Sequence, residues 1–142
     1  MELREVDKEE FNHNAQKFTC KNFFQTSNMG SSLELRGRKV YYLGLFDNTE
    51  CVALTMLVES GTFLLKKTFE ALKGFLIDYS DTDKVKIFTE KLLEFVQRIL
   101  FSETLNSDKN TTRHFQRSLK NPLLLFSFFF IHLRREECLQ LH

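Results

Sequence analysis

The chain has 142 residues and a formal net charge of +1, and 42% of its residues are hydrophobic against 27% charged. This length suits one domain with a buried core, and this balance is typical of a folded globular protein rather than a disordered chain. The small net charge argues against a dedicated nucleic-acid binder, in which basic residues dominate. DNA is therefore not an expected partner.

Three widely spaced cysteines, Cys20, Cys51 and Cys138, lack the short spacing of a zinc knuckle or a redox motif. We therefore expect reduced thiols in a cytoplasmic protein without a metal site. The charged start, MELREVDKEEF, lacks the apolar core of a secretion signal. The most apolar run, residues 122–133, is shorter than the ~20 residues of a membrane-spanning helix. We expect no membrane span.

The N-terminal part of the chain is predicted to form a short strand and two helices. Residues 3–6 favour the strand, and a D-x-x-E capping box then opens a helix over residues 7–17. Thr26 or Ser27 supplies the cap of a second helix, and Gly37 is a stop signal directly after it.

The middle of the chain reads as an antiparallel meander rich in β-branched and aromatic residues. The expected strands are 38–46, 51–58, 62–71 and 75–79. Turn residues at 47–50 and 60–61 separate the first three strands. The strand at 51–58, CVALTMLV, is almost wholly apolar, so we expect it to be buried on both faces.

A long helix follows the meander over residues 81–100, where apolar residues recur every three to four positions. The order of strand, two helices, meander and helix predicts an α+β fold in which helices cover one sheet. Residues 106–112 are polar and favour a loop. The ending, NPLLLFSFFFIHLRREECLQLH, has neither a strand alternation nor a helical stripe.

No general catalytic motif is present: the chain lacks a P-loop, G-x-G-x-x-G, HExxH and G-x-S-x-G. The histidines are scattered, at His13, His114, His132 and His142. Three carboxylates stand near strand ends, where an acid either acts as a general base or marks the exit to solvent. They are Glu59, Glu70 and Asp78.

Two groups of basic residues interrupt the predicted elements. One consists of Arg36, Arg38 and Lys39, and the other of Lys66, Lys67 and Lys73. Such groups hold phosphates through charge-assisted hydrogen bonds, or they are simply solvated charges. The residues alone leave both interpretations open.

Three segments are distinctive in combination: FFQTSNMGSSLELRGRKVYYLGL at 23–45, CVALTMLVESG at 51–61 and KGFLIDYSDTD at 73–83. Their order and spacing resemble the first domain of the FemABX family of peptidoglycan bridge-forming aminoacyltransferases. The chain keeps a Q-T-x-x-M helix start, a Y-L-G-L strand, and K-G and D-Y pairs that match the family pattern. It departs at Gly30, where the family usually has alanine, and at Phe75, where it has proline.

The resemblance implies a fold like that of the acetyltransferase (GNAT) superfamily, an incomplete, mixed and largely antiparallel sheet flanked by helices. It implies transfer of an amino acid from aminoacyl-tRNA to the stem peptide of a muropeptide or lipid-linked cell-wall precursor, without a cofactor. Contact with the membrane would be peripheral, through that substrate. An aminoacyl ester is already activated, so an enzyme mainly has to align it with the amine and stabilise the oxyanion. We expect acceptor contacts near Arg36, Lys39 and Lys73, and no catalytic residue is assigned.

The resemblance also divides the chain into a partial first domain, residues 1–105, and a divergent tail, residues 106–142. Because family enzymes are much longer, we expect a truncated first domain. A second hypothesis is non-catalytic: the apolar run 123–131 binds a partner or self-associates. An acetyl-CoA acetyltransferase is a weaker third hypothesis, because the five dispersed glycines form no pyrophosphate loop.

Overall fold

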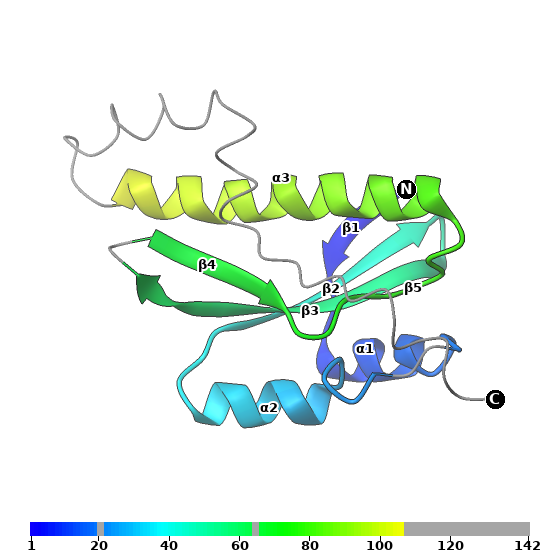
Figure 1. The fold of residues 1–142 in the computed structure, drawn as a ribbon, viewed down its shortest axis with the longest axis horizontal. Coiled ribbons are helices and arrows are strands. Elements are labelled where there is room, and N and C mark those ends of the chain that lie inside the picture. The colour runs from blue at the N-terminus through cyan, green and yellow to red at the C-terminus, as the bar shows by residue number, and fades with distance from the viewer. Residues whose placement is uncertain (20–21, 64–65, 107–142) are drawn as a thin grey trace.

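The computed structural model describes residues 1–19, 22–63 and 66–106, and its elements alternate between one sheet and the helices around it (Figure 1). The elements are β1 (Glu2–Glu5), α1 (Lys8–Ala15), α2 (Ser27–Leu35), β2 (Val40–Asp47), β3 (Glu50–Phe63), β4 (Lys66–Ala71), β5 (Leu76–Ile77) and α3 (Thr82–Asn106). Figure 1 shows α3 on one face of the sheet and α1 with α2 on the other. The predicted α+β fold with flanking helices is confirmed.

The sheet is antiparallel in every strand pair of the described residues, in the order β1-β2-β3-β4. The short strand β5 also pairs with β3, at Ala53 and Leu54, while β4 pairs with β3 further along, from Leu57 onward. Because β2 occupies the other side of β3, β4 and β5 share one edge of the sheet. The residues between β4 and β5 are not part of the sheet.

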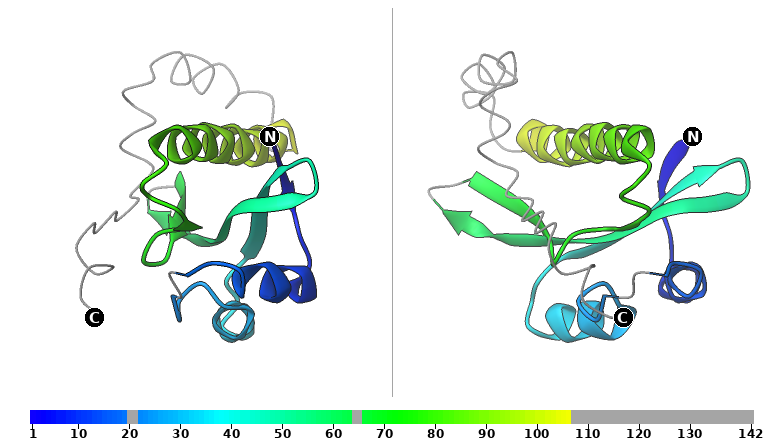
Figure 2. Two further views of the ribbon diagram at one scale, coloured as in Figure 1. Left: turned by 90° about the vertical axis from the view of Figure 1, so that its right-hand side faces the viewer. Right: turned by 45° about the vertical axis from the view of Figure 1, so that its right-hand side comes forward.

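Each face of the sheet has its own hydrophobic cluster. Figure 2 shows the helices as layers on the two sides of the sheet. The cluster under α3 includes Leu43, Leu57 and Phe88, and the cluster under α1 and α2 includes Phe11, Tyr42 and Met56. Adjacent β2 residues thus point to opposite faces. The predicted burial of β3 on both faces is confirmed: residues 53–58 are all buried.

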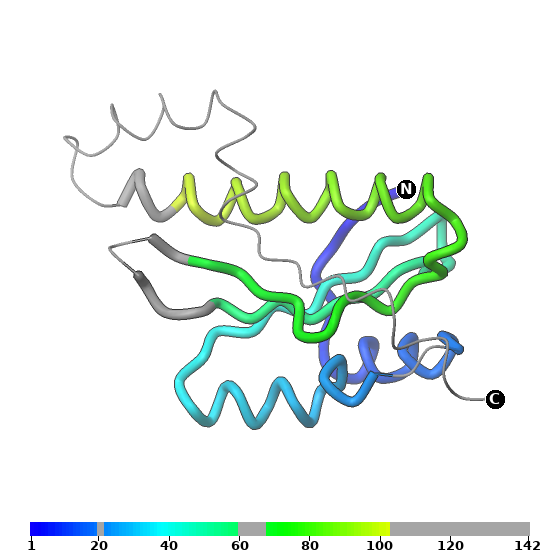
Figure 3. Tube along the Cα trace, in the orientation of Figure 1, coloured from blue at the N-terminus to red at the C-terminus, as the bar shows by residue number. Residues whose placement is uncertain are grey.

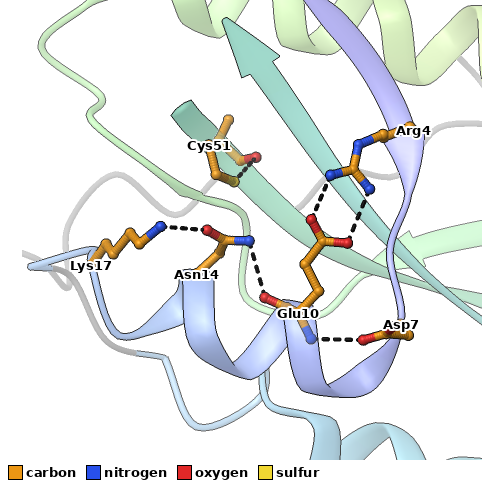
Figure 4. A network of polar contacts seen from close by, with 7 residues as sticks. Arg4, Asp7, Glu10, Asn14, Lys17 and Cys51 are labelled. Atoms are coloured by element: carbon orange, nitrogen blue, oxygen red, sulfur yellow. Dashed lines mark hydrogen bonds and ion pairs between the residues drawn. The ribbon is translucent and has the colours of Figure 1, made fainter. Parts of the chain in front are cut away.

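The first helix begins at the expected cap and is tied to β1 by an ion pair (Figure 4). The Asp7 side chain accepts a hydrogen bond from the Glu10 backbone N–H at 2.7 Å. The Glu10 carboxylate instead accepts two hydrogen bonds from the Arg4 guanidinium, at 3.0 and 2.5 Å. Glu10 therefore stabilises the docking of α1 on β1. Such an exposed pair contributes about 0–1 kcal/mol.

The second helix has both predicted end signals. The Thr26 hydroxyl accepts a hydrogen bond from the Met29 backbone N–H at 3.3 Å. At the other end Gly37 has φ 76°, a left-handed conformation in which glycine has no Cβ penalty. The next residue, Arg38, donates its backbone N–H to the Leu33 carbonyl at 3.0 Å, which closes the last turn.

Several predicted boundaries are wrong. The strand expected over 62–71 begins at Lys66, and the strand expected over 75–79 is limited to Leu76–Ile77. The expected turn at 60–61 lies inside β3, which continues to Phe63 with a register irregularity between Ser60 and Phe63. Glycine in a strand often marks such an irregularity rather than a turn. The last helix continues beyond Leu100 to Asn106, because residues 101–106 carry no helix breaker before the end of α3.

None of the helices in the described ranges is long and apolar enough to cross a bilayer. The tail that the sequence analysis places at 106–142 lies outside the described residues, apart from Asn106 at the end of α3. The division at residue 105 and the association of the run 123–131 stay predictions.

Candidate functional site

Two of the segments that carry the family resemblance meet in the structure, and Gln25 joins them. Its side chain is 1% exposed. The amide nitrogen donates to the Leu72 carbonyl at 3.0 Å, and the amide oxygen accepts from the Met56 backbone N–H at 2.6 Å. The same oxygen accepts from the Thr55 hydroxyl at 3.5 Å. Gln25 therefore fixes the start of α2 to β3 and to the chain that leaves β4.

A second amide repeats this connection at the surface. The Asn22 side chain donates to the Lys73 carbonyl at 3.0 Å and accepts from the Phe24 backbone N–H at 2.9 Å. Figure 3 shows the chain between β4 and β5 bending toward the layer that contains α2. Lys73 has φ 59°, a conformation that L-residues other than Asn and Asp adopt infrequently. The hydrogen bond to its carbonyl stabilises that turn.

The following residues form a local clamp around Gly74. Gly74 has φ 89°, and a Cβ atom there would lie 2.9 Å from the Tyr79 hydroxyl. That hydroxyl accepts from the Phe75 backbone N–H at 2.8 Å and donates to the Phe75 carbonyl at 3.1 Å. A proline at position 75 has no N–H to donate. Phe75, a departure from the family pattern, therefore supplies a hydrogen bond that proline could not. The Phe75 ring also packs edge-on against the Phe88 ring, with 5.1 Å between the ring centres.

The acids after the clamp act as caps. Asp78 accepts from the backbone N–H of Ser80 at 2.9 Å and from its hydroxyl at 2.6 Å, and these bonds lower the pKa of Asp78. Asp81 accepts from the Lys84 backbone N–H at 3.0 Å at the start of α3, and its pKa is also lowered. A lowered pKa weakens a carboxylate as a base. Asp78 thus has a structural role in this loop.

Gly30, the other departure from the family pattern, is explained by Tyr42. A Cβ atom at Gly30 would lie 2.0 Å from the Tyr42 hydroxyl and 2.8 Å from the Met56 sulfur. The Tyr42 hydroxyl is buried and has no hydrogen-bond partner in the described part of the chain. Burial, with a smaller contribution from Glu34, raises the pKa of Tyr42 to about 12. The tyrosine hydroxyl occupies the space that an alanine methyl group would need.

The three predicted substrate-binding cations lie at two ends of α2. Lys73 is exposed beside the chain that precedes α2, whereas exposed Arg36 and Lys39 follow that helix. Nine residues of helix separate these ends by about 13 Å. The ammonium of Lys39 stands 5.0 Å from the centre of the Tyr41 ring. Arg36 and Lys39 thus both follow the C-terminal end of α2, and Lys73 lies near the other end.

The remaining candidate groups lie elsewhere. Glu59 accepts a hydrogen bond from the Tyr41 hydroxyl at 3.4 Å, and Glu70 is exposed on β4. Cys51 is a free, buried thiol, and burial raises its pKa to about 11, which disfavours the nucleophilic thiolate. The residues that the structure describes include no cluster of side chains suited to a metal ion.

The arrangement is suited to binding rather than to acid–base chemistry. The ring of Phe23 is 70% exposed and packs edge-on against that of Phe24, 5.8 Å away. Together with Lys73, whose carbonyl is bonded to Asn22, they offer two aromatic rings and one cation on two hydrogen-bonded segments. Gln25 was recognised in the sequence only as part of the Q-T-x-x-M helix start, and its role in building this turn was not predicted. Asn22 carried no signal beyond its place a few residues before the helix cap.

A comparison with known protein families identifies the family of this chain. The sequence profile of the FemAB family matches residues 6–108, more than half of the chain. The chain belongs to the FemAB family. The matched range contains the three segments that carry the resemblance, so the resemblance seen in the sequence is confirmed.

A solved structure supports the fold of this FemAB family chain. The crystal structure of FemX superimposes with a TM-score of 0.61 at 15% sequence identity. The similarity covers 69% of this chain but 25% of the FemX chain. The chain thus spans about a quarter of the length of FemX. No curated protein matches the chain.

Proposed function

We propose that this FemAB family chain contributes the acceptor-binding part of an aminoacyltransferase. The enzyme would move an amino acid from aminoacyl-tRNA to the stem peptide of a peptidoglycan precursor in the cytoplasm. The match of the family profile to residues 6–108 is the observation that carries the proposal. The meeting of the Gln25 and Lys73 segments, which carry the resemblance, supports it.

The chemistry asks for positioning more than for proton transfer. An aminoacyl ester is already activated, so its alignment with the acceptor amine can lower the barrier by several kcal/mol. In well-oriented reactions this effect reaches ~7–11 kcal/mol. A nucleotide- or lipid-linked precursor carries phosphates, which cations bind through charge-assisted hydrogen bonds. We assign this role to Lys73 at one end of α2 and to Arg36 and Lys39 at the other.

The first test is binding of a UDP-linked muropeptide to the purified 142-residue protein by calorimetry. Lys73→Ala should weaken binding about tenfold, the loss expected for one charge-assisted hydrogen bond. Lys86→Ala, at an exposed position on α3, is the matched control and should bind normally. Equal affinities for wild type, Lys73→Ala and Arg36→Ala would contradict the assignment of the cations.

The second test is transfer of a labelled amino acid from charged tRNA to the same muropeptide. A longer FemAB family protein serves as the positive control, because this chain spans a quarter of FemX. Incorporation by the positive control, but neither binding nor incorporation by this chain, would contradict the proposed function.

A second candidate is a non-catalytic role in which the apolar run 123–131 binds a partner or self-associates. Size-exclusion chromatography of the chain with and without residues 107–142 distinguishes the two. If both chains elute at the volume expected for their monomer mass, association through that segment is contradicted.

A further inference from the structure

The free edge of the sheet at β1 has a defined hydrogen-bonding pattern. Among the described strands β1 pairs only with β2, and the Val6 N–H donates to the Tyr42 carbonyl at 3.0 Å. Because hydrogen-bonded and non-hydrogen-bonded pairs alternate in an antiparallel ladder, Arg4 and Val6 direct their backbone groups toward β2. Leu3 and Glu5 therefore direct theirs outward, away from the sheet.

A groove runs between this edge and α3, the helix that lies next to β1 in Figure 2. It encloses about 480 Å³. Its walls include Leu3 and Glu5 of β1 and Phe95, Arg98 and Ile99 of α3. Leu3 and Ile99 also pack against the core cluster under α3, so the floor of the groove is apolar and continuous with the core.

The two arginines at the groove differ in availability. Arg4 is held by both oxygens of Glu10 and lies 4.0 Å from the centre of the Phe46 ring. Figure 4 shows that pair directed toward α1. Arg98 is exposed, and its guanidinium lies 5.7 Å from the centre of the Phe95 ring. Arg98 has no carboxylate partner in the part of the chain that the structure describes.

We propose that the β1–α3 groove binds an extended acidic segment of a partner polypeptide, which adds as a strand to β1. The outward groups of Leu3 and Glu5 are two residues apart, which is the repeat of an extended peptide backbone. Backbone pairing gives such strand addition its affinity, and pockets for alternate side chains give it specificity. An apolar side chain meets Leu3 and Ile99, and a carboxylate on the same face meets Arg98. This inference is independent of the proposed transferase activity.

The probe is the fluorescein-labelled peptide Ser-Val-Thr-Glu-Thr-Val-Ser, which is rich in β-forming residues, with binding followed by fluorescence anisotropy. In the full 142-residue chain, Glu5→Pro removes one outward N–H, and proline is tolerated at that orientation on an edge strand. Glu5→Thr is the matched control, because it removes the carboxylate but keeps the N–H. We expect Glu5→Pro and Arg98→Gln each to weaken binding about tenfold, and Glu5→Thr to bind at least as well as wild type.

Several outcomes would overturn the proposal. One is no binding of the probe to the wild type at about 1 mM, the weakest affinity that a specific site would show. Another is equal binding of a probe with lysine in place of its glutamate. A monomer–dimer equilibrium that Glu5→Pro abolishes would assign the edge to a second copy of the chain instead. Should Glu5→Pro fail to fold, a probe N-methylated at alternate residues tests the same backbone bonds, and undiminished binding of that probe contradicts the proposal.

Discussion

Substituting Gly30 by alanine, the residue usual in the family, should destabilise this chain. A helical glycine is ordinarily worse than alanine by about 1 kcal/mol, so propensity alone predicts a gain. The new methyl group would lie 2.0 Å from the Tyr42 hydroxyl and 2.8 Å from the Met56 sulfur, well inside contact distance. Overpacking of this kind costs about 1–3 kcal/mol. The closest atom belongs to a ring on β2, which cannot move away as a flexible side chain could. After the propensity gain is subtracted, we expect a net loss of up to about 2 kcal/mol in the free energy of unfolding.

A double-mutant cycle with Tyr42→Phe isolates the contact. The Tyr42 hydroxyl has no hydrogen-bond partner in the described ranges, so its removal should be nearly neutral. In the Tyr42→Phe background the 2.0 Å contact is gone, although the ring carbon at 2.8 Å remains. Gly30→Ala should therefore cost about 1 kcal/mol less in that background, a coupling typical of residues in contact. Urea unfolding measures all four proteins, and an equal loss in both backgrounds would refute the explanation.

The same pair gives a pH-dependent readout. The pKa of Tyr42 is raised from 10.0 to about 12, so the folded state keeps the hydroxyl protonated where the unfolded state ionises. The contribution of the protonated Tyr42 side chain to the free energy of unfolding is therefore fully present below pH 10 and is lost as the pH rises toward about 12. Wild type should therefore lose stability relative to Tyr42→Phe above pH 10. The Cys51 thiol titrates in both proteins and cancels in the comparison.

Three further outcomes follow from buried or strained groups. Gln25→Leu leaves the buried Met56 N–H and the part-buried Leu72 carbonyl without that partner, and it should cost about 2–5 kcal/mol in urea unfolding. Gln16→Leu, at an exposed glutamine, should stay within about 0.5 kcal/mol; equal effects would contradict the role of the Gln25 hydrogen bonds. Gly74→Ala should destabilise more than Gly37→Ala, because both residues have positive φ but only the first meets a side chain; the reverse order, by thermal unfolding, would be inconsistent with the contact. In a background without the other two cysteines, Cys51 should react with a thiol reagent at neutral pH only after unfolding; rapid labelling of the folded protein would show that the thiol is accessible.

Local rules predicted the elements whose signals are short in sequence. Asp7, Thr26 and Gly37 mark helix ends through bonds to residues within a few positions, and the structure shows each of them in that role. The apolar run of β3 likewise indicated its burial. The expected turn at 60–61 failed because a glycine in a strand and a glycine in a turn look alike until the partner strand is known.

The candidate site was less predictable because its bonds span many residues. Gln25 reaches Met56 and Leu72, which are 31 and 47 positions away. Sequence periodicity carries no information on such contacts, since they depend on how α2 settles against the sheet. The cations could be found from charge alone, but their separation by the length of α2 required the fold.

Each departure from the family pattern is matched by a tyrosine hydroxyl. At position 30 the absence of a methyl group leaves room for the hydroxyl of Tyr42, and at position 75 the presence of an N–H gives the hydroxyl of Tyr79 a donor. Gly30 and Phe75 are both buried, so both departures are compatible with a packed domain. Each departure is thus explained by a contact of its own, separate from the bonds that join the Gln25 and Lys73 segments. The chain therefore keeps the fold that it shares with FemX over 69% of its length while it differs from the family pattern at these two positions.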